Sequence, residues 1–428
     1  MMRTGKSLRS WNLILAGGIL LASTLRAQTL TDDQLDAVKA RLAEGATHSW
    51  EIGTRTEALI ESDTPTYSVL NNTSLPPPKG QAPSSLDEVI SIASSVVQAR
   101  AKADVQGPQP LMDANGGAAG DPPSIGVAVL LANWTGAGAQ DGHDYAGAAQ
   151  DQLEYLLEKV PKTSDGAISH RQEQVQLQYL VDSDAGGMWK HIVMGQNTDS
   201  GHWSTGNGWA AAGMLRVLGT IQNSQYAKNM KKQAKDLSGW VSEIHGGIYP
   251  HLRSNGLFGN YADDSSTFDD ASSTAILAST VYRLALLAGI HTHLPKPNKA
   301  ARRSSRQPPA LSALPAPRKP PPPRASSATS SAASSASPSA TALVGPAMQH
   351  FTSDMWLTPV VNPNQFGIQG SKSPEGQAFV VELDAAWRDW AALGSPGANA
   401  AVRVRGGQAG ELAVLACVGV VLSLLFGL

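Results

Sequence analysis

The chain has 428 residues, of which 42% are hydrophobic and 16% charged, and its formal net charge is -2. This length is enough to bury the core of one large domain or of two smaller ones. A net charge near zero gives no excess of basic residues of the kind found in nucleic-acid-binding proteins, so nucleic acid is excluded as a partner.

The two ends of the chain are typical of an exported protein that is held at a membrane. Residues 1–27 combine basic residues, an apolar run and small residues up to Ala27, which predicts a signal peptide. Residues 395–428 form a polar spacer and then a nearly continuous apolar run, which also holds the only cysteine, Cys417. This run predicts either a glycolipid-anchor signal or a short membrane helix. Both alternatives predict a secreted, membrane-anchored protein at the cell surface.

Most of the chain between these ends has a helical pattern. Apolar periodicity predicts helices over 85–103, 125–134, 145–160, 209–221, 226–244 and 272–288. Some of these segments are almost wholly apolar and others are amphipathic with charges, as expected for the inner and outer helices of a toroid. An ordinary helical bundle would show the same periodicity.

A stretch rich in proline, serine and alanine interrupts this pattern at 296–345. Its composition cannot bury enough apolar surface to order itself, so we expect it to be disordered. The globular domain is therefore predicted in two parts, 28–295 and 346–394. In the second part, Ser373 and Pro374 lead into another helix with an apolar face.

The segment from His202 to Gly219, HWSTGNGWAAAGMLRVLG, has the most distinctive composition in the chain. We expect a glycine-broken polar loop that carries Trp203, Asn207 and Trp209, followed at once by a helix. Flat apolar rings beside a close-approach backbone suit stacking on sugar rings, which need polar groups around their rims. The alternative is that both tryptophans are core residues at the start of a helix.

Several motifs, taken in chain order, resemble the six-hairpin glycosidases. They are ANGGAAGDPPSIGVAVLLANWT, DGAISHR, GGMWKH, GHWSTGNGWAAAGML, DDASSTAILASTVYRLA and SPEGQAF. More closely, they are similar to fungal relatives of glycoside hydrolase families 88 and 105, the unsaturated uronyl and rhamnogalacturonyl hydrolases. The resemblance implies an all-α fold, an (α/α)6 toroid of six helical hairpins, with its site in the loops at one end.

The resemblance also implies a reaction. The substrates are oligosaccharides left by polysaccharide lyases, with a C4–C5 double bond in the terminal uronic sugar. An aspartic acid protonates C4 and then, as the carboxylate, activates water to attack C5; the hemiketal collapses and releases the next sugar. This is vinyl-ether hydration rather than displacement at the anomeric carbon, so the spacing rule for paired carboxylates does not apply.

The chain departs from the family pattern in two places. Ser204 and Thr205 stand where the family has glycine and an arginine that can meet the uronate carboxylate, and a threonine cannot form a charged fork. The family's catalytic aspartate should follow the DGAISHR motif, but no matching Trp-x-Asp sequence is present. Residues 172–182 provide only about 16 Å of helix, enough for a single leg. We therefore expect that most of one hairpin is missing, with a seam near 177–178.

The catalytic residue is thus unknown. Two aspartates are candidates, on the basis of their positions in the sequence. Asp165 is the nearest carboxylate to the gap, and Asp121 lies in the loop AAGDPPS; either can instead be a turn residue.

For substrate binding, the family position favours His170, which as a lone loop histidine can otherwise be a solvated residue. His202 borders the tryptophan segment and is a weaker candidate than Trp203, Asn207 and Trp209.

Other motifs in the sequence point to modification and to cofactor use. Asn71, Asn72 and Asn133 stand in glycosylation sequons, which apply in a eukaryotic cell. No nucleophile elbow, zinc spacing or glycine-rich phosphate loop is found, so neither a metal nor an organic cofactor is predicted.

Three functions follow as alternatives. The first is a surface-anchored hydrolase acting on oligosaccharides that end in an unsaturated uronic sugar. The second is a non-catalytic surface protein that binds carbohydrate. The third is a cell-wall α-1,6-mannanase-like enzyme that uses the acidic pairs Asp263–Asp264 and Asp269–Asp270, although these also suit the acid-rich start of a helix.

Overall fold

The computed structural model describes residues 30–71, 74–77, 79–80, 82–101, 107–113, 118–162, 180–193, 198–294, 350–362 and 364–398. The predicted signal peptide, the predicted disordered segment and the apolar C-terminal run lie outside these residues. Asp165, His170 and Asn72 also lie outside them, as does the predicted seam near 177–178. The predictions for these segments therefore stay predictions.

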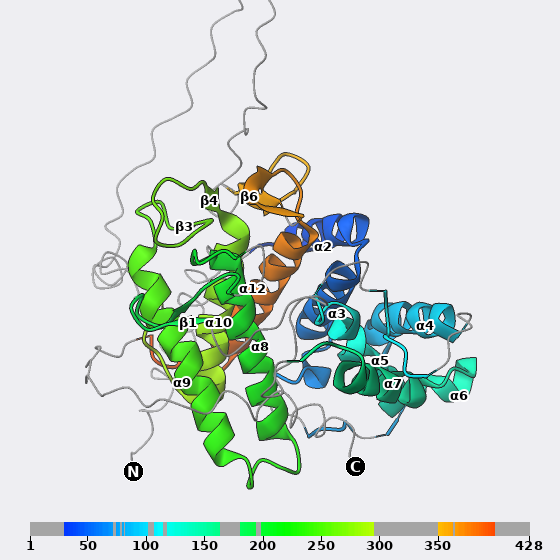
Figure 1. The fold of residues 1–428 in the computed structure, drawn as a ribbon. Coiled ribbons are helices and arrows are strands. Elements are labelled where there is room, and N and C mark those ends of the chain that lie inside the picture. Colours follow the sequence, from blue (N-terminus) through cyan, green and yellow to red (C-terminus); the bar gives the residue numbers. More distant parts are fainter. Residues whose placement is uncertain are drawn as a thin grey trace, which may run out of the picture.

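Helices make up most of the described structure, as predicted (Figure 1). The α-helices are α2 (Asp32–Gly45), α3 (Ser49–Asp63), α4 (Asp87–Ala101), α5 (Gly126–Thr135), α6 (Gly138–Asp141), α7 (Tyr145–Glu158), α8 (Ser204–Asn223), α9 (Lys231–Ile248), α10 (Ala271–Ala288) and α12 (Pro374–Ala392). Short 3-10 turns are η2 (Pro65–Tyr67), η3 (Ser84–Leu86), η4 (Pro122–Ile125) and η5 (Tyr249–His251). Strands pair in three antiparallel hairpins, β1 (Val181–Asp182) with β2 (Met188–Trp189), β3 (Phe258–Gly259) with β4 (Asp269–Asp270), and β5 (Val360–Asn362) with β6 (Gln365–Gly370).

All the predicted helices in the described residues are found, but the start of α8 was placed wrongly. The glycine-broken loop predicted before Trp209 is instead helical from Ser204. Glycine, serine and asparagine are poor helix formers in isolation. Here tertiary contacts override that tendency, because a Cβ on Gly208 would lie 2.4 Å from Ile276 of α10. Gly208 thus allows α8 and α10 to pack closely at their first turns.

The inner helices α3, α8, α10 and α12 run parallel to one another. α10 packs against both α8 and α12, and α12 packs against α3. Their first turns also meet, because the Trp50 indole N–H donates to Glu375 and the Cβ of Ser272 lies close to Gly376. We call the end of the bundle formed by these first turns the N-terminal face.

α5 joins this face as a further inner helix, and the outer helix α2 runs the opposite way. The Ser124 hydroxyl, just before α5, donates to the Ser49 carbonyl oxygen at the start of α3, at 3.1 Å. α2 ends against the start of α12, since a Cβ on Gly45 would lie 2.8 Å from Pro374. This alternation of inner and outer helices is the arrangement predicted for a toroid of helical hairpins.

Two apolar regions of the core share α3. One surrounds α5 and is formed with α3, α4 and α7, and the other lies between α2, α3, α8, α10 and α12. Neighbouring α3 residues divide between them, with Ala58 in the second and Leu59 and Ile60 in the first. α3 therefore connects the two halves of the described domain.

The described residues between α7 and α8 form a β-hairpin rather than a helix. They comprise 159–162, 180–193 and 198–203, and their regular structure is the β1–β2 pair with an isolated bridge between Ile192 and Asp199. The expected absence of an inner helix concerns the neighbouring residues 163–179, which lie outside the described part and leave that prediction untested.

Buried charges connect the inner helices along their common axis. We call this group the axial ion cluster; its members are Glu57, Glu61, Arg216, Arg283, Glu382 and Asp389. Arg216 of α8 lies 2.9 Å from Glu61 of α3 and 2.8 Å from Glu382 of α12. Arg283 of α10 lies 3.1 Å from Glu61 and also pairs with Asp389. Removing one partner would leave a buried charge uncompensated, so the cluster fixes how these four helices sit along the axis.

One helix in the described part, α10, is long and apolar enough to cross a membrane by length and composition alone. In the structure 72% of it is buried inside the protein, between α8 and α12. Its apolar character is therefore explained by its central place in the bundle.

We predict that Gly208→Ala destabilises the protein by about 1–3 kcal/mol, because the added methyl group overpacks the contact with Ile276. The β-branched Ile276 side chain cannot move its Cγ2 atom without leaving its rotamer. The measurement is the free energy of unfolding in urea. Gly213→Ala on the same helix is the control: no atom lies within 4 Å of its Cβ position, so it should stabilise by about 0.5–1 kcal/mol. Equal effects of the two substitutions would contradict the close packing of α8 on α10.

We predict that the stability of the folded protein falls as pH rises from about 5 to 8. Burial raises the pKa of Glu57 from 4.5 to about 7 and that of Glu382 to about 8, against the lowering effect of Arg216. The folded state therefore binds these protons more tightly than the unfolded state, and their stabilisation is complete below about pH 4.5 and lost through pH 7–8. Glu57→Gln should make this fall shallower by roughly 2–3 kcal/mol in urea unfolding. Parallel pH profiles of variant and wild type would contradict the assignment.

Candidate functional site

Trp203 is held rigidly at the start of α8. Its indole N–H donates to Asn260 Oδ1 at 3.0 Å. The Ser204 backbone N–H donates to the Asn260 carbonyl oxygen at 2.9 Å, and its hydroxyl donates to the Gly259 carbonyl oxygen at 2.6 Å. The predicted sugar-stacking ring thus has a fixed orientation on a helix end instead of a place in a flexible loop.

His191 and Phe366 extend this ring into an aromatic group, which we define as His191, Trp203 and Phe366. The centroid of the His191 ring lies 4.7 Å from that of Trp203 and 4.3 Å from that of Phe366. All three side chains are half-buried. His191 and Phe366 were not among the residues predicted from the sequence; the only signal for His191 was its place in the GGMWKH motif.

Asp199 fixes the orientation of His191. Its carboxylate lies 2.9 Å from His191 Nδ1 and also accepts a hydrogen bond from the Tyr261 hydroxyl. Burial alone would raise the pKa of Asp199, but the hydrogen bonds from Tyr261 and His191 outweigh it and lower that pKa. Burial and the Asp199 charge together raise the pKa of Tyr261. Asp199 is therefore an ionised acceptor that holds the ring, and a poor proton donor.

His202, a predicted sugar ligand, lies buried between two carboxylates. Its Nδ1 atom is 2.7 Å from Asp263 and its Nε2 atom is 3.4 Å from Asp182. Lys190 also pairs with Asp182 at 3.0 Å, and this lysine is the main reason that the pKa of Asp182 is lowered. His202 links the β1–β2 hairpin to the loop after β3. Contact between His202 and a sugar stays a prediction.

Asn207, also predicted to bind substrate, uses its side-chain amide in hydrogen bonds to the backbone. Its Oδ1 accepts from the Trp189 N–H at 2.7 Å, and its Nδ2 donates to the carbonyl oxygens of Trp189 and Trp203 at 2.9 and 3.0 Å. The side chain is 1% exposed. Asn207 therefore holds strand β2 against the first turn of α8, and its part in substrate binding is untested.

Trp209 is half-buried one and a half turns into α8. Its ring meets that of Phe379 of α12 edge to face, with 5.0 Å between centroids. The ring is thus part core and part surface, between the two alternatives that the sequence left open.

The side chains of Thr205 and Asp270 form a hydrogen bond with each other inside the protein. The Thr205 hydroxyl donates to Asp270 at 3.0 Å, so it does not replace the family's arginine. Asp270 is fully buried and caps α10 by accepting from the backbone N–H groups of Ser272 and Ser273. The interpretation of Asp270 as a helix cap is confirmed.

The other acidic residues of the mannanase-like alternative also have partners. Asp269 accepts from Arg253 at 2.6 Å and from Asn255 at 2.7 Å. Asp264 accepts from the N–H and hydroxyl of Ser266 in a turn. Asp263, as described, contacts His202.

Asp121 lies in the turn before α5, at the N-terminal face. Its Oδ2 accepts from the Ala118 N–H at 2.7 Å, and its carbonyl oxygen accepts from Ser124. It therefore supports a turn, and no observation tests it as an acid. Among the sequon residues, Asn133 is exposed near the end of α5, and the Asn71 carbonyl oxygen accepts from Asn223.

Trp50 and Glu375 form a second pair at this face that the sequence analysis missed. Glu375 is buried and accepts a hydrogen bond from the Trp50 indole. The signal for Glu375 lay in its spacing, because an acid recurs at residues 375, 382 and 389 along the apolar side of α12.

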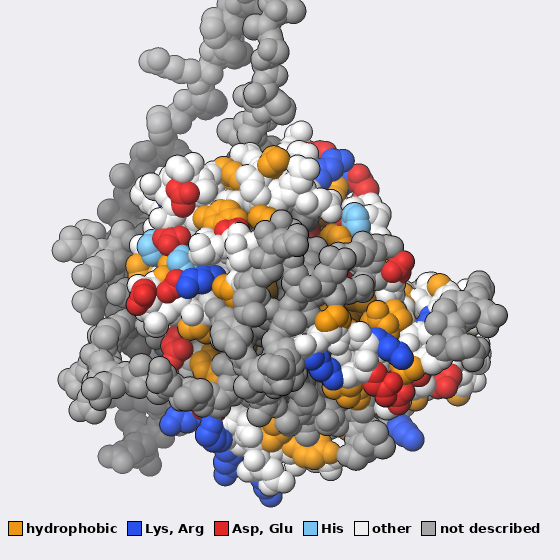
Figure 2. All heavy atoms as spheres, viewed as in Figure 1, with side chains coloured by type: hydrophobic (Ala, Val, Ile, Leu, Met, Phe, Trp, Pro, Cys, Tyr) orange, Lys and Arg blue, Asp and Glu red, His pale blue; other side chains and the backbone are white. Residues whose placement is uncertain are grey.

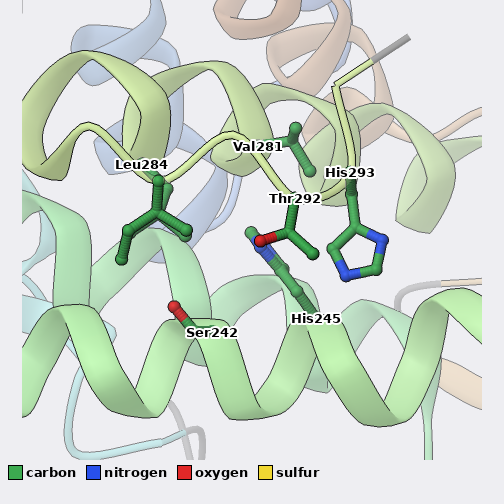
Figure 3. Close-up of a pocket in the computed structure, with 7 residues that line it drawn as sticks. Ser242, His245, Val281, Leu284, Thr292 and His293 are labelled. Carbon is green, nitrogen blue, oxygen red and sulfur yellow. The ribbon is translucent and has the colours of Figure 1, made fainter. Parts of the chain in front are cut away.

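A small cavity between α9 and α10 contains two histidines (Figure 3). His245 and His293 line it, with ring centroids 6.0 Å apart. Its volume is near 10 Å³, room for about one water. Burial, with a smaller effect of His293, lowers the pKa of His245 to about 3, and its Nε2 lies 2.8 Å from the Thr280 hydroxyl. The cavity is too small for a sugar.

Lysines gather at the opposite end of α8, around the turn into α9 (Figure 2). Lys228, Lys231, Lys232 and Lys235 are all exposed there. Lys232 pairs with Asp236 of the same helix at 2.8 Å. Exposed side chains of this kind are typical of a solvated surface, and the candidate site is at the other end.

Metal binding finds no support among the described residues, where no three His, Cys, Asp or Glu side chains converge. The absence of a metal and of an organic cofactor stays a prediction.

Comparison with solved structures identifies the fold. The chain is similar to a possible member of the GH105 family from Klebsiella pneumoniae, with a TM-score of 0.51, 11% identity, and coverage of 84% of this chain and 94% of that one. A possible member of the GH105 family from Salmonella enterica gives a TM-score of 0.50, 11% identity, and coverage of 84% and 95%. The chain shares the fold of these structures. The predicted all-α class and the structural resemblance to family 105 are thereby confirmed.

Other comparisons add little. An unsaturated glucuronyl hydrolase from Bacillus sp. GL1 matches with 18% identity over 63% of this chain and 62% of that one, but its TM-score of 0.27 supports no argument. No protein-family model matches the chain. No curated protein matches it either.

We predict that Asn207→Ala loosens the β1–β2 hairpin and costs about 1–3 kcal/mol, because it leaves partly buried backbone groups of Trp189 unpaired. Hydrogen exchange of the Trp189 amide should become faster in the variant than in wild type. Gln222→Ala on the same helix removes one exposed hydrogen bond to Leu287 and serves as the control. Unchanged exchange at Trp189 in Asn207→Ala would contradict the clamping role.

Proposed function

We propose that the chain is a glycoside hydrolase that acts on oligosaccharides ending in an unsaturated uronic sugar, by hydration of the C4–C5 double bond. The observation that carries the proposal is the aromatic group, which presents half-buried rings on a rigid helix end. Rings held in this way suit the apolar face of a pyranose. The shared fold with possible GH105 family members supports a glycoside hydrolase.

The uronate carboxylate needs a cation, and Lys190 is the side chain that we propose for this role. It is adjacent in sequence to His191, and its side chain is 31% exposed although it pairs with Asp182. A lysine binds a carboxylate as a point charge, without the geometry of an arginine fork. The proposal therefore includes weaker recognition of the uronate than an arginine would give.

Carbohydrate binding without catalysis is the second candidate, and one observation favours it. The side chains of Asn207, Thr205 and Asp270 all form hydrogen bonds to other groups of the protein. The start of α8 thus offers rings but few free polar atoms. For either function, we propose that the predicted signal and anchor segments place the protein at the cell surface.

We expect the wild-type chain to consume unsaturated rhamnogalacturonan or chondroitin disaccharides, measured as loss of the ultraviolet absorbance of the C4–C5 double bond. Lys190→Met should raise KM about tenfold, since it removes a charge-assisted contact worth roughly 1.5 kcal/mol. Lys235→Met, at the far end of the bundle, should leave KM unchanged.

Binding without any loss of absorbance would support the non-catalytic candidate instead. Turnover with the same KM in both lysine variants would retain the hydrolase but reject Lys190 as the uronate partner.

A further inference from the structure

The inner helices α3, α8 and α12 place side chains toward the bundle axis at two heights, which we call the lower and the upper level. At the lower level, within the axial ion cluster, Arg216 of α8 contacts Glu382 of α12 and lies 3.6 Å from Glu57 of α3. These three positions therefore face one another across the axis.

Seven residues earlier on each helix stand Trp209, Glu375 and Trp50. Seven residues are close to two helical turns, so these side chains leave the same faces about 10 Å nearer the N-terminal face. The contacts agree with this placement. Trp50 donates to Glu375, and Trp209 packs against Phe379, one turn after Glu375.

Glu375 is the carboxyl group of this upper level. It is 6% exposed, and it accepts from the Trp50 indole N–H and from the Ser373 hydroxyl, the latter at 3.1 Å. Glu382 on the same face pairs with Arg216, but no lysine or arginine in the described part of the chain forms an ion pair with Glu375. Burial, reinforced by the nearby charge of Glu51, raises the pKa of Glu375 to about 7.

Trp50 and Trp209 supply apolar ring surface at this level, although the His48 ring stacks on one face of Trp50 with 4.6 Å between centroids. Both tryptophans are half-buried, Trp50 in the first turn of α3 and Trp209 in the second turn of α8. A sugar that stacks on these rings would have Glu375, the hydrogen-bond partner of Trp50, at its edge. The upper level thus combines what binding of a pyranose needs with one acid.

Other carboxylates at the N-terminal face are less suited to donating a proton. Asp199 has a lowered pKa because of Tyr261 and His191, and Asp270 uses its oxygens to cap α10. Asp121 accepts a backbone hydrogen bond in a turn. A general acid must carry its proton at the working pH, which favours Glu375 among these residues.

Resting on the proposed hydration reaction, we propose that Glu375 is its proton donor and acceptor. The C4–C5 edge of the unsaturated sugar then lies between Trp50 and Trp209, and its carboxylate points toward Lys190 and the aromatic group. The Glu375 carboxyl gives its proton to C4, and the electron pair of the C4–C5 double bond forms the new C4–H bond. C5 is left with a positive charge shared with the ring oxygen. Water then bonds to C5 and returns one proton to the Glu375 carboxylate.

This step adds one water to the sugar and restores the acid, so it needs no oxidant, reductant or further reactant. The resulting hemiketal opens at the ring oxygen and releases the next sugar. The same group thereby serves both halves of the reaction, so no second catalytic carboxylate is required. Glu51, the buried carboxylate beside Glu375, accepts from the backbone N–H groups of Thr47 and His48.

The test compares Glu375→Gln with Glu57→Gln in the hydration assay. The glutamine at 375 keeps an acceptor for Trp50 but carries no transferable proton, so kcat should fall about 100-fold or more while KM changes less than about threefold. Glu57→Gln replaces another buried glutamate of raised pKa, which lies two helical turns below Trp50 on α3. This variant should keep kcat within about threefold. Wild-type kcat should also fall as pH rises through about 7, as the protonated acid is depleted.

The outcomes separate the two proposals. Turnover by wild type that persists in Glu375→Gln, or a wild-type kcat that is constant from pH 6 to 9, overturns the role of Glu375 and leaves the proposed function standing. No turnover by wild type overturns the proposed function and the acid together. If Glu375→Gln does not fold, the wild-type pH profile and Glu375→Asp, which should lower kcat while keeping its fall through pH 7, still decide the matter.

Discussion

The axial ion cluster is the constraint on which the rest of the structure depends. Two arginines and four acids from α3, α8, α10 and α12 meet in a mostly buried group, so sliding any one helix would leave buried guanidinium and carboxyl groups without their partners. Parallel packing of apolar helices alone would tolerate such sliding more easily. Because the cluster fixes the helices along the axis, their first turns end at one level, and that level is the N-terminal face.

The N-terminal face divides its residues between two tasks. Asn207, Ser204, Thr205 and Asp270 form hydrogen bonds that hold strands and helix starts in place. Trp203, Trp209 and Trp50 keep part of their rings accessible. Glu375 lies at the same level as the Trp50 and Trp209 rings. Unlike Glu382, two helical turns further along α12, it forms no ion pair with an arginine in the described part of the chain. This difference between two acids on the same helix face is what separates a structural carboxylate from a candidate catalytic one.

Much of the fold could be predicted from the sequence, because helices leave a local periodic signal. Every helix predicted within the described residues is present, and Ser373 caps α12 as its place before Pro374 suggested. The start of α8 was missed because Ser204, Gly206 and Asn207 are poor helix formers and become helical only through contacts with the β2 and β3 segments. The axial ion cluster was missed for a related reason. Its partners, such as Glu61 and Arg216, lie 155 residues apart in the chain, and no local pattern joins them.

The site was predicted in outline and changed in detail. The tryptophan segment does lie at the end of the bundle where inner helices begin, but its polar residues Ser204, Thr205 and Asn207 proved to be internal supports. His191, Phe366, Trp50 and Glu375 came from other segments, and only folding brings them to this end. The most direct test of the account is a crystal structure of the Glu375→Gln variant with an unsaturated uronyl disaccharide. The account predicts the unsaturated ring between Trp50 and Trp209, with its C4 atom facing the side chain at position 375. A sugar bound elsewhere, or one with C4 turned away from that side chain, would contradict it.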